Sequence, residues 1–153
     1  MPIRCEIVSQ DRMVFEGDVD IVVAPSTLGE MGILPNHAPL IAILDFGVLK
    51  VRYQGREELF TVAGGILEVQ PDIVIVLADV AENVREIDIA RAEAAKERAE
   101  NYLAEGAPLD ADAYLRLEAA LRRSKLRLDA VRRYRRGQRS PIQPMLEDDT
   151  PRS

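Results

Sequence analysis

The pattern of apolar residues changes once along this chain of 153 residues, close to position 84. Before that point apolar and polar residues alternate over short stretches, which is typical of half-buried β-strands, and seven of the nine glycines lie there. After it, two stretches rich in alanine and charged residues carry apolar positions at helical spacing. The sequence therefore predicts an α+β fold: a β domain over 1–84, a hairpin of two helices over 85–139, and a Pro-containing tail over 140–153 that we expect to be disordered.

The β domain contains eight or so short strand-like segments, which favours a sandwich or a flattened barrel. Val19, Ile21 and Val23 are expected to share one face of a strand. Gly55 lies between two apolar runs and is expected to adopt the positive φ of a hairpin turn. The run Ile73–Leu77 has no polar residue, so we expect a central strand that is covered on both faces.

The helical region is predicted to form two antiparallel helices that approach closely. Gly106 is placed to end the first helix, while Asp88 and Asp110 are placed to cap the first and second helices. An alanine contact buries far less area than a leucine contact at ~25 cal/mol per Å², so the hairpin should be marginally stable and able to open and bind elsewhere. The expected apolar positions are Ala92, Ala95, Ala99 and Leu103 in the first helix, and Leu117, Ala120, Leu121, Ser124, Leu128 and Val131 in the second.

Charge is distributed unevenly within a net charge of −6. Residues 1–115 carry nine Lys or Arg against 21 Asp or Glu, whereas residues 116–139 carry ten against two. The basic stretch can be a solvated helix face, a nucleic-acid surface or a surface that docks on acidic protein. A nucleic-acid surface is disfavoured because the remaining chain is strongly acidic and no aromatic stacking set accompanies the basic residues.

Composition excludes several other classes of protein. A single cysteine rules out an internal disulfide, and one cysteine with one histidine is too few for a typical zinc site. Cys5 alternates with Ile3 and Ile7, so we expect it to be buried. No apolar run is long enough to span a bilayer, and the N-terminus has no apolar signal-peptide core. No nucleophile or acid–base pair stands out, so an enzyme in its own right is a poor interpretation.

Two stretches resemble a known family. Gly-Glu-Met-Gly-Ile-Leu-Pro-Asn-His-Ala-Pro-Leu over 29–40 and Gly-Gly-Ile-Leu-Glu-Val over 64–69 resemble the epsilon subunit of bacterial and chloroplast F-type ATP synthases. The resemblance implies a ten-stranded β sandwich followed by an antiparallel two-helix hairpin. It also implies that Glu30 and His37 lie at a subunit interface, with Glu30 in a loop that faces the c ring.

The resemblance further implies a non-catalytic rotor subunit of a proton-translocating ATP synthase. Its partners would be the gamma subunit, the c-subunit ring and the alpha/beta catalytic head, with no nucleic acid. The subunit would couple proton flow to ATP synthesis and restrain ATP hydrolysis through its hairpin. It would be peripheral on the cytoplasmic face of the bacterial membrane, or on the stromal side of the thylakoid, and would reach the membrane only through the complex.

A third match concerns a nucleotide. The segment Ile-Asp-Ile-Ala-Arg-Ala over 87–92 is similar to the pattern that marks an ATP site on the folded hairpin of bacterial members. By this resemblance no cofactor is required and ATP is a regulatory ligand. The residues implied to bind ATP are Glu82, Ile87, Asp88, Arg91, Ala92, Arg98, Arg123 and Arg127.

The spacing of the arginines is compatible with phosphate binding. Arg91 and Arg98 share a face of the first helix, and Arg123 and Arg127 share a face of the second. Folding the hairpin is expected to bring the four guanidinium groups together, where they would match the oxygens of a polyphosphate. A phosphate-binding loop of the hydrolytic type is absent from the sequence, which favours binding without turnover. The alternative function is a free-standing module that senses ATP without joining a rotor.

Overall fold

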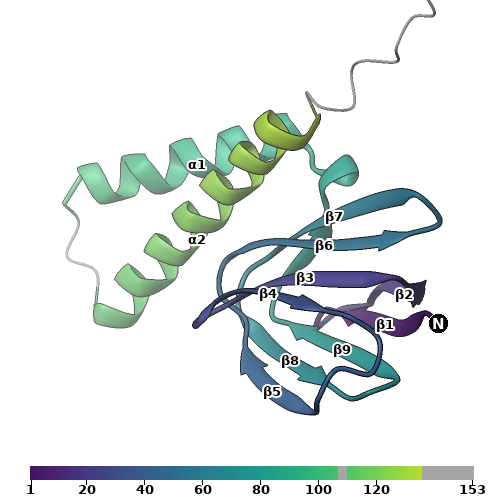
Figure 1. Ribbon diagram of the computed structural model, residues 1–153. Helices are drawn as coiled ribbons and strands as arrows, with labels where there is room; N and C mark the ends of the chain where they lie inside the picture. Colours follow the sequence, from purple (N-terminus) through teal and green to yellow (C-terminus); the bar gives the residue numbers. More distant parts are fainter. Residues whose placement is uncertain (107–109, 136–153) are drawn as a thin grey trace, which may run out of the picture.

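The computed structural model describes residues 1–106 and 110–135 and consists of two stacked β-sheets beside a pair of helices (Figure 1). The first sheet contains, in spatial order, β2 (Met13–Val19), β1 (Ile3–Val8), β9 (Ile73–Ala78), β8 (Gly65–Val69) and β5 (Leu40–Ile43). The second contains β10 (Ala81–Asn83), β7 (Arg56–Val62), β6 (Gly47–Tyr53), β3 (Ile21–Ser26) and β4 (Gly29–Ile33). The predicted ten-stranded sandwich is confirmed.

The helical part follows the last strand directly. A short 3₁₀ turn, η1 (Val84–Glu86), leads into α1 (Ile89–Ala104), and α2 (Ala111–Ala130) returns beside it and ends in a turn of π-helix, η2 (Val131–Arg135). The predicted two-helix hairpin is therefore confirmed. The tail that we expected to be disordered, 140–153, lies outside the described residues.

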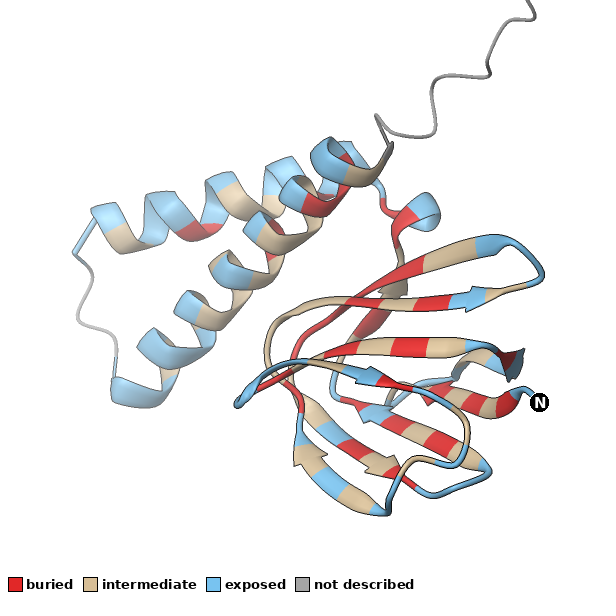
Figure 2. Ribbon diagram, viewed as in Figure 1, coloured by how far each residue is buried: buried red, intermediate tan, exposed pale blue. Residues whose placement is uncertain are grey.

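The core lies between the two sheets, where strands turn alternate residues inward (Figure 2). Phe60 is its largest fully buried side chain, and Ile3, Leu49 and Leu67 are fully buried in the same cluster. Cys5 is buried in the same core, and desolvation raises the pKa of its thiol to about 12. The expectation that Cys5 is a buried apolar residue is confirmed.

One expectation about an individual strand was wrong, and two strands were not anticipated. Val22 and Ala24, rather than Ile21 and Val23, face the core, because Val19 ends one strand and the chain changes register at Asp20 before the next begins. The two strands not anticipated as such, β4 and β10, are short edge strands with little apolar alternation.

The run Ile73–Leu77 also differs from its expected environment. Its strand is central, paired with β1 in parallel and with β8 antiparallel. However, Leu77 is 49% exposed, so the described residues, 1–106 and 110–135, leave that end of the outer face of the first sheet partly open to solvent. The apolar composition of this strand therefore creates exposed apolar surface.

Turns and caps follow the sequence closely. Gln54 and Gly55 have φ of 50° and 71°, so the positive φ expected at Gly55 is confirmed. Asp88 and Asp110 each accept a hydrogen bond from a backbone N–H of the first helical turn, at 3.0 and 2.7 Å. Gly106, with φ of 60°, follows the end of α1. Both predicted helix caps are confirmed.

Candidate functional site

The hairpin contacts the sandwich through the C-terminal part of α2. Ala130 and Val131 pack against Leu59 of β7 and against Val84 and Ile87 of the segment that joins the two domains. This apolar cluster contains five buried residues, whereas the sandwich core contains 18. The interface between hairpin and sandwich is thus much smaller than the core that stabilises the sandwich itself.

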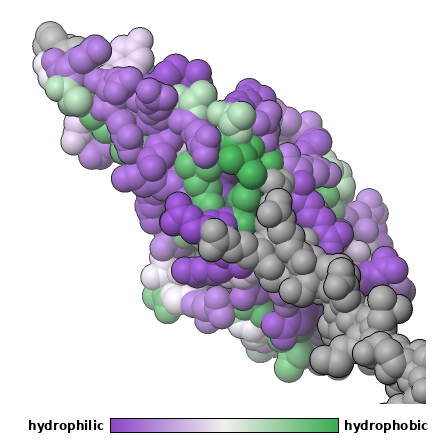
Figure 3. All heavy atoms as spheres, turned by 90° about the horizontal axis from the view of Figure 1, so that it is seen from above, coloured by the Kyte–Doolittle hydropathy of each residue, from purple (hydrophilic) through white to green (hydrophobic). Residues whose placement is uncertain are grey.

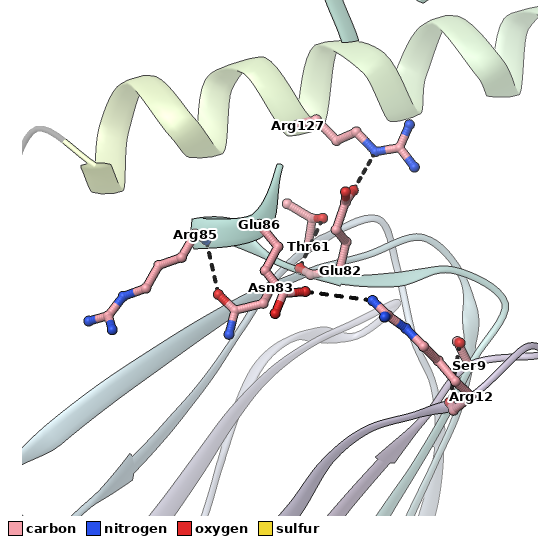
Figure 4. A network of polar contacts seen from close by, with 8 residues as sticks. All are labelled: Ser9, Arg12, Thr61, Glu82, Asn83, Arg85, Glu86 and Arg127. Carbon is pink, nitrogen blue, oxygen red and sulfur yellow. Dashed lines mark hydrogen bonds and ion pairs between the residues drawn. The ribbon is translucent and has the colours of Figure 1, made fainter. Parts of the chain in front are cut away.

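An ion pair lies at the edge of this cluster. Arg127 of α2 donates through Nε to the Glu82 carboxylate of β10 at 2.8 Å, with side chains 30% and 25% exposed (Figure 4). On the other side of the chain, Glu86 pairs with Arg12 at 3.6 Å, and Asn83 accepts from the backbone N–H of Arg85. Polar contacts therefore organise the link between the last strand and α1.

A second set of contacts lies further toward the middle of α2. Arg122 approaches the Asp45 carboxylate at 3.3 Å and stacks over the ring of Phe46, with 4.2 Å between the guanidinium carbon and the ring centroid. Beyond the C-terminal end of α2, Nζ of Lys50 lies 5.3 Å from the ring centre of Tyr134 in η2. Sequence reasoning identified the basic stretch but not these partners, because nothing in the sequence indicates which turn of the sandwich a helix will touch.

A cavity of about 260 Å³ lies between the start of α1 and α2. It brings together six of the eight residues expected to bind ATP, and Glu86 in addition. Arg98 is exposed and Arg123 half-buried, and neither lines this cavity. The volume falls just below the ~300–1,000 Å³ that is typical of ligand pockets. The lining residues are Glu82, Glu86, Ile87, Asp88, Arg91, Ala92 and Arg127.

The charges in this cavity differ from the expected cluster of four guanidinium groups. Two arginines, Arg91 and Arg127, meet three carboxylates, of Glu82, Glu86 and Asp88. The position opposite Arg127, where a phosphate would be bound, is taken by Glu82. Asp88 uses one carboxylate oxygen to cap α1, so its predicted capping role and a contact with ligand are compatible.

Glu30 and His37, which are expected at a subunit interface, lie in different elements of the sandwich domain. Glu30 lies in the edge strand β4, and not in a loop as expected; it borders a hollow of about 300 Å³ that Arg133 and Tyr134 also line. His37 lies in the loop between β4 and β5 and donates from Nδ1 to the carbonyl oxygen of Ala38 at 2.7 Å.

The outer face of the first sheet carries a row of exposed apolar side chains. Ile43 of β5 is paired in register with Ile66 of β8, which is paired with Leu77 of β9. These residues are 62%, 48% and 49% exposed, and the nearby Ile41 is 74% exposed. Exposed apolar patches are a common feature of protein interaction sites.

The outer side of the hairpin has a further apolar hollow. Figure 3 shows apolar atoms gathered between the helices and surrounded by hydrophilic ones. Ile89, Leu128 and Val131 line this hollow of about 390 Å³, with Glu93 and Arg132 among the charged residues at its edge. Within the described residues, the docked hairpin thus leaves part of its apolar surface uncovered.

The described part of the chain contains neither a helix that could cross a membrane nor a cluster of metal-binding side chains. Neither α1 nor α2 is long and apolar enough to cross a membrane. Over residues 1–106 and 110–135, no group of three or more His, Cys, Asp or Glu side chains is arranged to hold a metal ion.

Comparison with known proteins assigns both parts of this arrangement. Residues 2–84 match the model for the β-sandwich domain of the ATP synthase delta/epsilon chain, and residues 85–132 match the model for its long α-helix domain. The chain belongs to the ATP synthase delta/epsilon chain family. The fold and the resemblance predicted from the sequence are thereby confirmed.

Individual members of the delta/epsilon family agree over most of their length. The ATP synthase epsilon chain of Dehalococcoides mccartyi is 46% identical over 140 residues, covering 88% of this chain and 95% of the relative. The epsilon chain of Pelotomaculum thermopropionicum is 52% identical over 101 residues, covering 66% and 75%. The chain is therefore related to epsilon chains in particular, which are stalk subunits and not the catalytic subunits.

One solved structure supports the same assignment, and a second shares the fold. A chain of the Euglena gracilis mitochondrial ATP synthase, determined as OSCP/F1/c-ring in rotational state 1, has a TM-score of 0.68 and 26% identity, covering 84% of this chain and 80% of that one. A chain from the Tetrahymena thermophila mitochondrial ATP synthase central stalk and c-ring has a TM-score of 0.58 at 13% identity, covering 86% and 97%, and shares the fold.

Proposed function

We propose that this protein is the epsilon subunit in the rotor of a proton-translocating F-type ATP synthase, where it links the gamma subunit to the c ring. The observation that carries this proposal is a β sandwich with one apolar face that the described residues leave exposed, beside a hairpin held by a small interface. The gamma subunit would cover the apolar row formed by Ile43, Ile66 and Leu77, since contact with a partner would remove these side chains from water. Glu30 and His37 are proposed to contact the c ring.

The hairpin is proposed to act as a two-state element that restrains ATP hydrolysis. Its docked position rests on the five-residue apolar cluster and on ion pairs whose partners are partly or largely exposed. Exposed pairs contribute only about 0–1 kcal/mol each, so undocking requires little free energy. The basic face of α2 would then exchange the carboxylates of Asp45 and Glu82 for acidic surfaces of the alpha/beta head.

ATP is proposed to favour the docked state by binding to it alone. The cavity formed by Asp88, Arg91 and Arg127 draws on both helices and, through Glu82, on the sandwich, so it exists only while the hairpin is folded and docked. A ligand that binds one of two states shifts the population by its differential affinity. The protein would bind ATP without hydrolysing it.

The inhibitory role is tested by ending the chain at residue 84 and measuring ATP hydrolysis by the assembled complex. The truncated subunit retains all ten strands, so it should still assemble, while hydrolysis should rise because no hairpin can reach the head. Assembly is checked by co-purification with gamma. Unchanged hydrolysis in a fully assembled complex would refute the inhibitory role.

The nucleotide role is tested by calorimetric titration of the isolated protein with ATP. Asp88→Ala and Arg127→Gln alter two residues that line the cavity and should weaken binding, while Arg116→Gln removes an arginine that lines none of the cavities described above and should leave it unchanged. If the unaltered protein does not bind ATP, the proposed regulation by ATP is refuted.

The proposed location is the membrane periphery, on the cytoplasmic side in bacteria, reached through the complex. The alternative function, a free-standing module that senses ATP, draws on the same cavity but gives no role to the apolar row on the first sheet. Co-purification distinguishes the two functions. A stable complex with a long coiled-coil partner supports the rotor subunit, and a solitary monomer supports the free-standing module.

A further inference from the structure

A larger cavity than those described so far, of about 540 Å³, lies where the β6–β7 hairpin meets η2. Its walls come from the sandwich, from η1 and from η2, and none of its residues belongs to the site expected to bind ATP. Its volume is within the ~300–1,000 Å³ typical of ligand pockets. The lining residues are Tyr53, Arg56, Glu57, Glu58, Leu59, Arg85, Arg133 and Tyr134.

Three arginines reach this cavity from three different elements. Arg56 comes from β7, Arg85 from η1 and Arg133 from η2. Figure 4 shows the Arg85 side chain directed away from Glu82 and Arg127, so the cavity is separate from the one between α1 and α2. Convergent guanidinium groups match the oxygens of phosphates, to which they donate paired hydrogen bonds.

The carboxylates of the cavity already have partners. Glu57 accepts from Nε of Arg52 at 2.6 Å, and Glu58 accepts from the hydroxyl of Tyr53 at 3.1 Å. Desolvation and this hydrogen bond to Glu58 raise the pKa of Tyr53, so its hydroxyl remains a donor at neutral pH. Arg56 and Arg133, by contrast, form no ion pair with any residue in the described ranges.

We propose that this cavity binds a small polyphosphate anion, held mainly by Arg56 and Arg133. With three arginines and two glutamates the lining has a positive formal charge, in a protein whose net charge is −6. Non-specific attraction of anions to the rest of the protein is therefore weak, and binding depends on this local arrangement. The ligand bridges the sandwich and the hairpin, since Arg56 belongs to one and Arg133 to the other.

Bridging has a consequence for the hairpin, which rests on the two-state behaviour proposed above. An anion held by both arginines is bound only while η2 lies against the β6–β7 hairpin. It therefore stabilises the docked state in addition to any nucleotide bound between α1 and α2.

The proposal is tested by calorimetric titration of the full chain with inorganic pyrophosphate at low ionic strength. Arg56→Gln and Arg133→Gln should each weaken binding about tenfold, equivalent to about 1.4 kcal/mol. Glu57→Gln removes a negative charge from the lining and should tighten binding. Arg116→Gln makes the same charge change as the two arginine variants but lies on an exposed part of α2 outside the cavity, and should have no effect.

Further variants and ligands separate this site from the nucleotide site. Arg127→Gln and Asp88→Ala should leave pyrophosphate binding intact, so the result does not depend on whether ATP binds. Pyrophosphate and ADP are compared to distinguish an inorganic from a nucleotide source, and binding of either through Arg56 and Arg133 supports the proposal. It is overturned if neither ligand binds, or if binding survives Arg56→Gln and Arg133→Gln but is lost in Arg127→Gln.

Discussion

Replacing Glu82 by Gln should release the hairpin from the sandwich by a predictable amount. The substitution removes the charge that Arg127 contacts at 2.8 Å, with the two side chains 25% and 30% exposed. Exposed ion pairs contribute about 0–1 kcal/mol, and hydrogen bonds to charged groups in buried settings about 1.5–3 kcal/mol. For a partly exposed pair we expect about 1 kcal/mol, which lowers the ratio of docked to undocked hairpin about fivefold.

Hydrogen exchange measures this ratio one segment at a time. Backbone amides of α2 exchange when the hairpin opens, whereas those of β1 and β9 exchange only when the sandwich unfolds. Glu82→Gln should therefore reduce protection about fivefold in α2 and leave the central strands unchanged. Glu86→Gln is the matched control, because its partner Arg12 belongs to the sandwich and both side chains are more than half exposed.

A double-mutant cycle tests whether the loss of protection comes from the ion pair between Glu82 and Arg127. Arg127→Gln should have a similar effect alone and almost none in the Glu82→Gln background, since the interaction is already lost. Strictly additive effects would refute the assignment of docking energy to this pair. Equal loss of protection in α2 and in the central strands would refute independent opening of the hairpin.

Three further predictions concern the sandwich. The pKa of the Cys5 thiol is raised from 9.0 to about 12 in the folded state, so the thiol of the unfolded state loses its proton first as pH rises. Between pH 9 and 12 the free energy of unfolding of the wild type, measured by chemical denaturation, should therefore fall relative to that of Cys5→Ala by about 1.4 kcal/mol per pH unit. An equal dependence of stability on pH in the two proteins would contradict this. Gly65→Ala places a Cβ in steric conflict with the carbonyl oxygen of Leu77. It should destabilise the sandwich by clearly more than Gly55→Ala, whose Cβ meets no neighbouring atom and which should lose about 1–2 kcal/mol from its positive φ; equal melting temperatures of the two variants would argue against the close approach. Ile43→Ser, at a 62% exposed position, should leave the melting temperature unchanged and weaken co-purification with gamma, and full retention of gamma would exclude the apolar row as its contact.

Most of the fold follows from local patterns in the sequence. Alternation located the longer strands, and Gly55, Gly106 and Asp110 marked turns and caps correctly, because positive φ and capping depend on neighbouring residues alone. The edge strand β4 was not anticipated because Gly29-Glu30-Met31-Gly32 lacks an apolar face. Its pairing with β3 is a property of the assembled sheet.

Burial could be predicted less well than secondary structure. The apolar run Ile73–Leu77, in β9, was expected to be covered on both faces. The sequence of one chain does not distinguish a face buried by its own fold from a face that a partner would cover. For the same reason, the exposed apolar row became visible only when the register of β5, β8 and β9 was known.

In the candidate site, too, local features could be predicted from the sequence and long-range contacts could not. The segment 87–92 and the residues beside it were found from their resemblance to the family pattern, and the structure brings six of the eight expected residues together. The pairing of Arg127 with Glu82, 45 positions apart, depends on how the hairpin lies against the sandwich. Local spacing correctly placed arginines on helix faces but could not identify the carboxylates that they would meet.

The central claim is that the hairpin exchanges a docked position for one that obstructs hydrolysis. The most direct test locks the hairpin in place by substituting cysteines for Asp45 and Arg122, whose side chains touch at 3.3 Å, and joining them with a short bismaleimide in the assembled ATP synthase. The buried Cys5 is replaced by Ala beforehand. We predict that the locked complex hydrolyses ATP as fast as one whose subunit ends at residue 84, while the unlinked variant stays inhibited. Inhibition that persists in the locked complex would contradict the account.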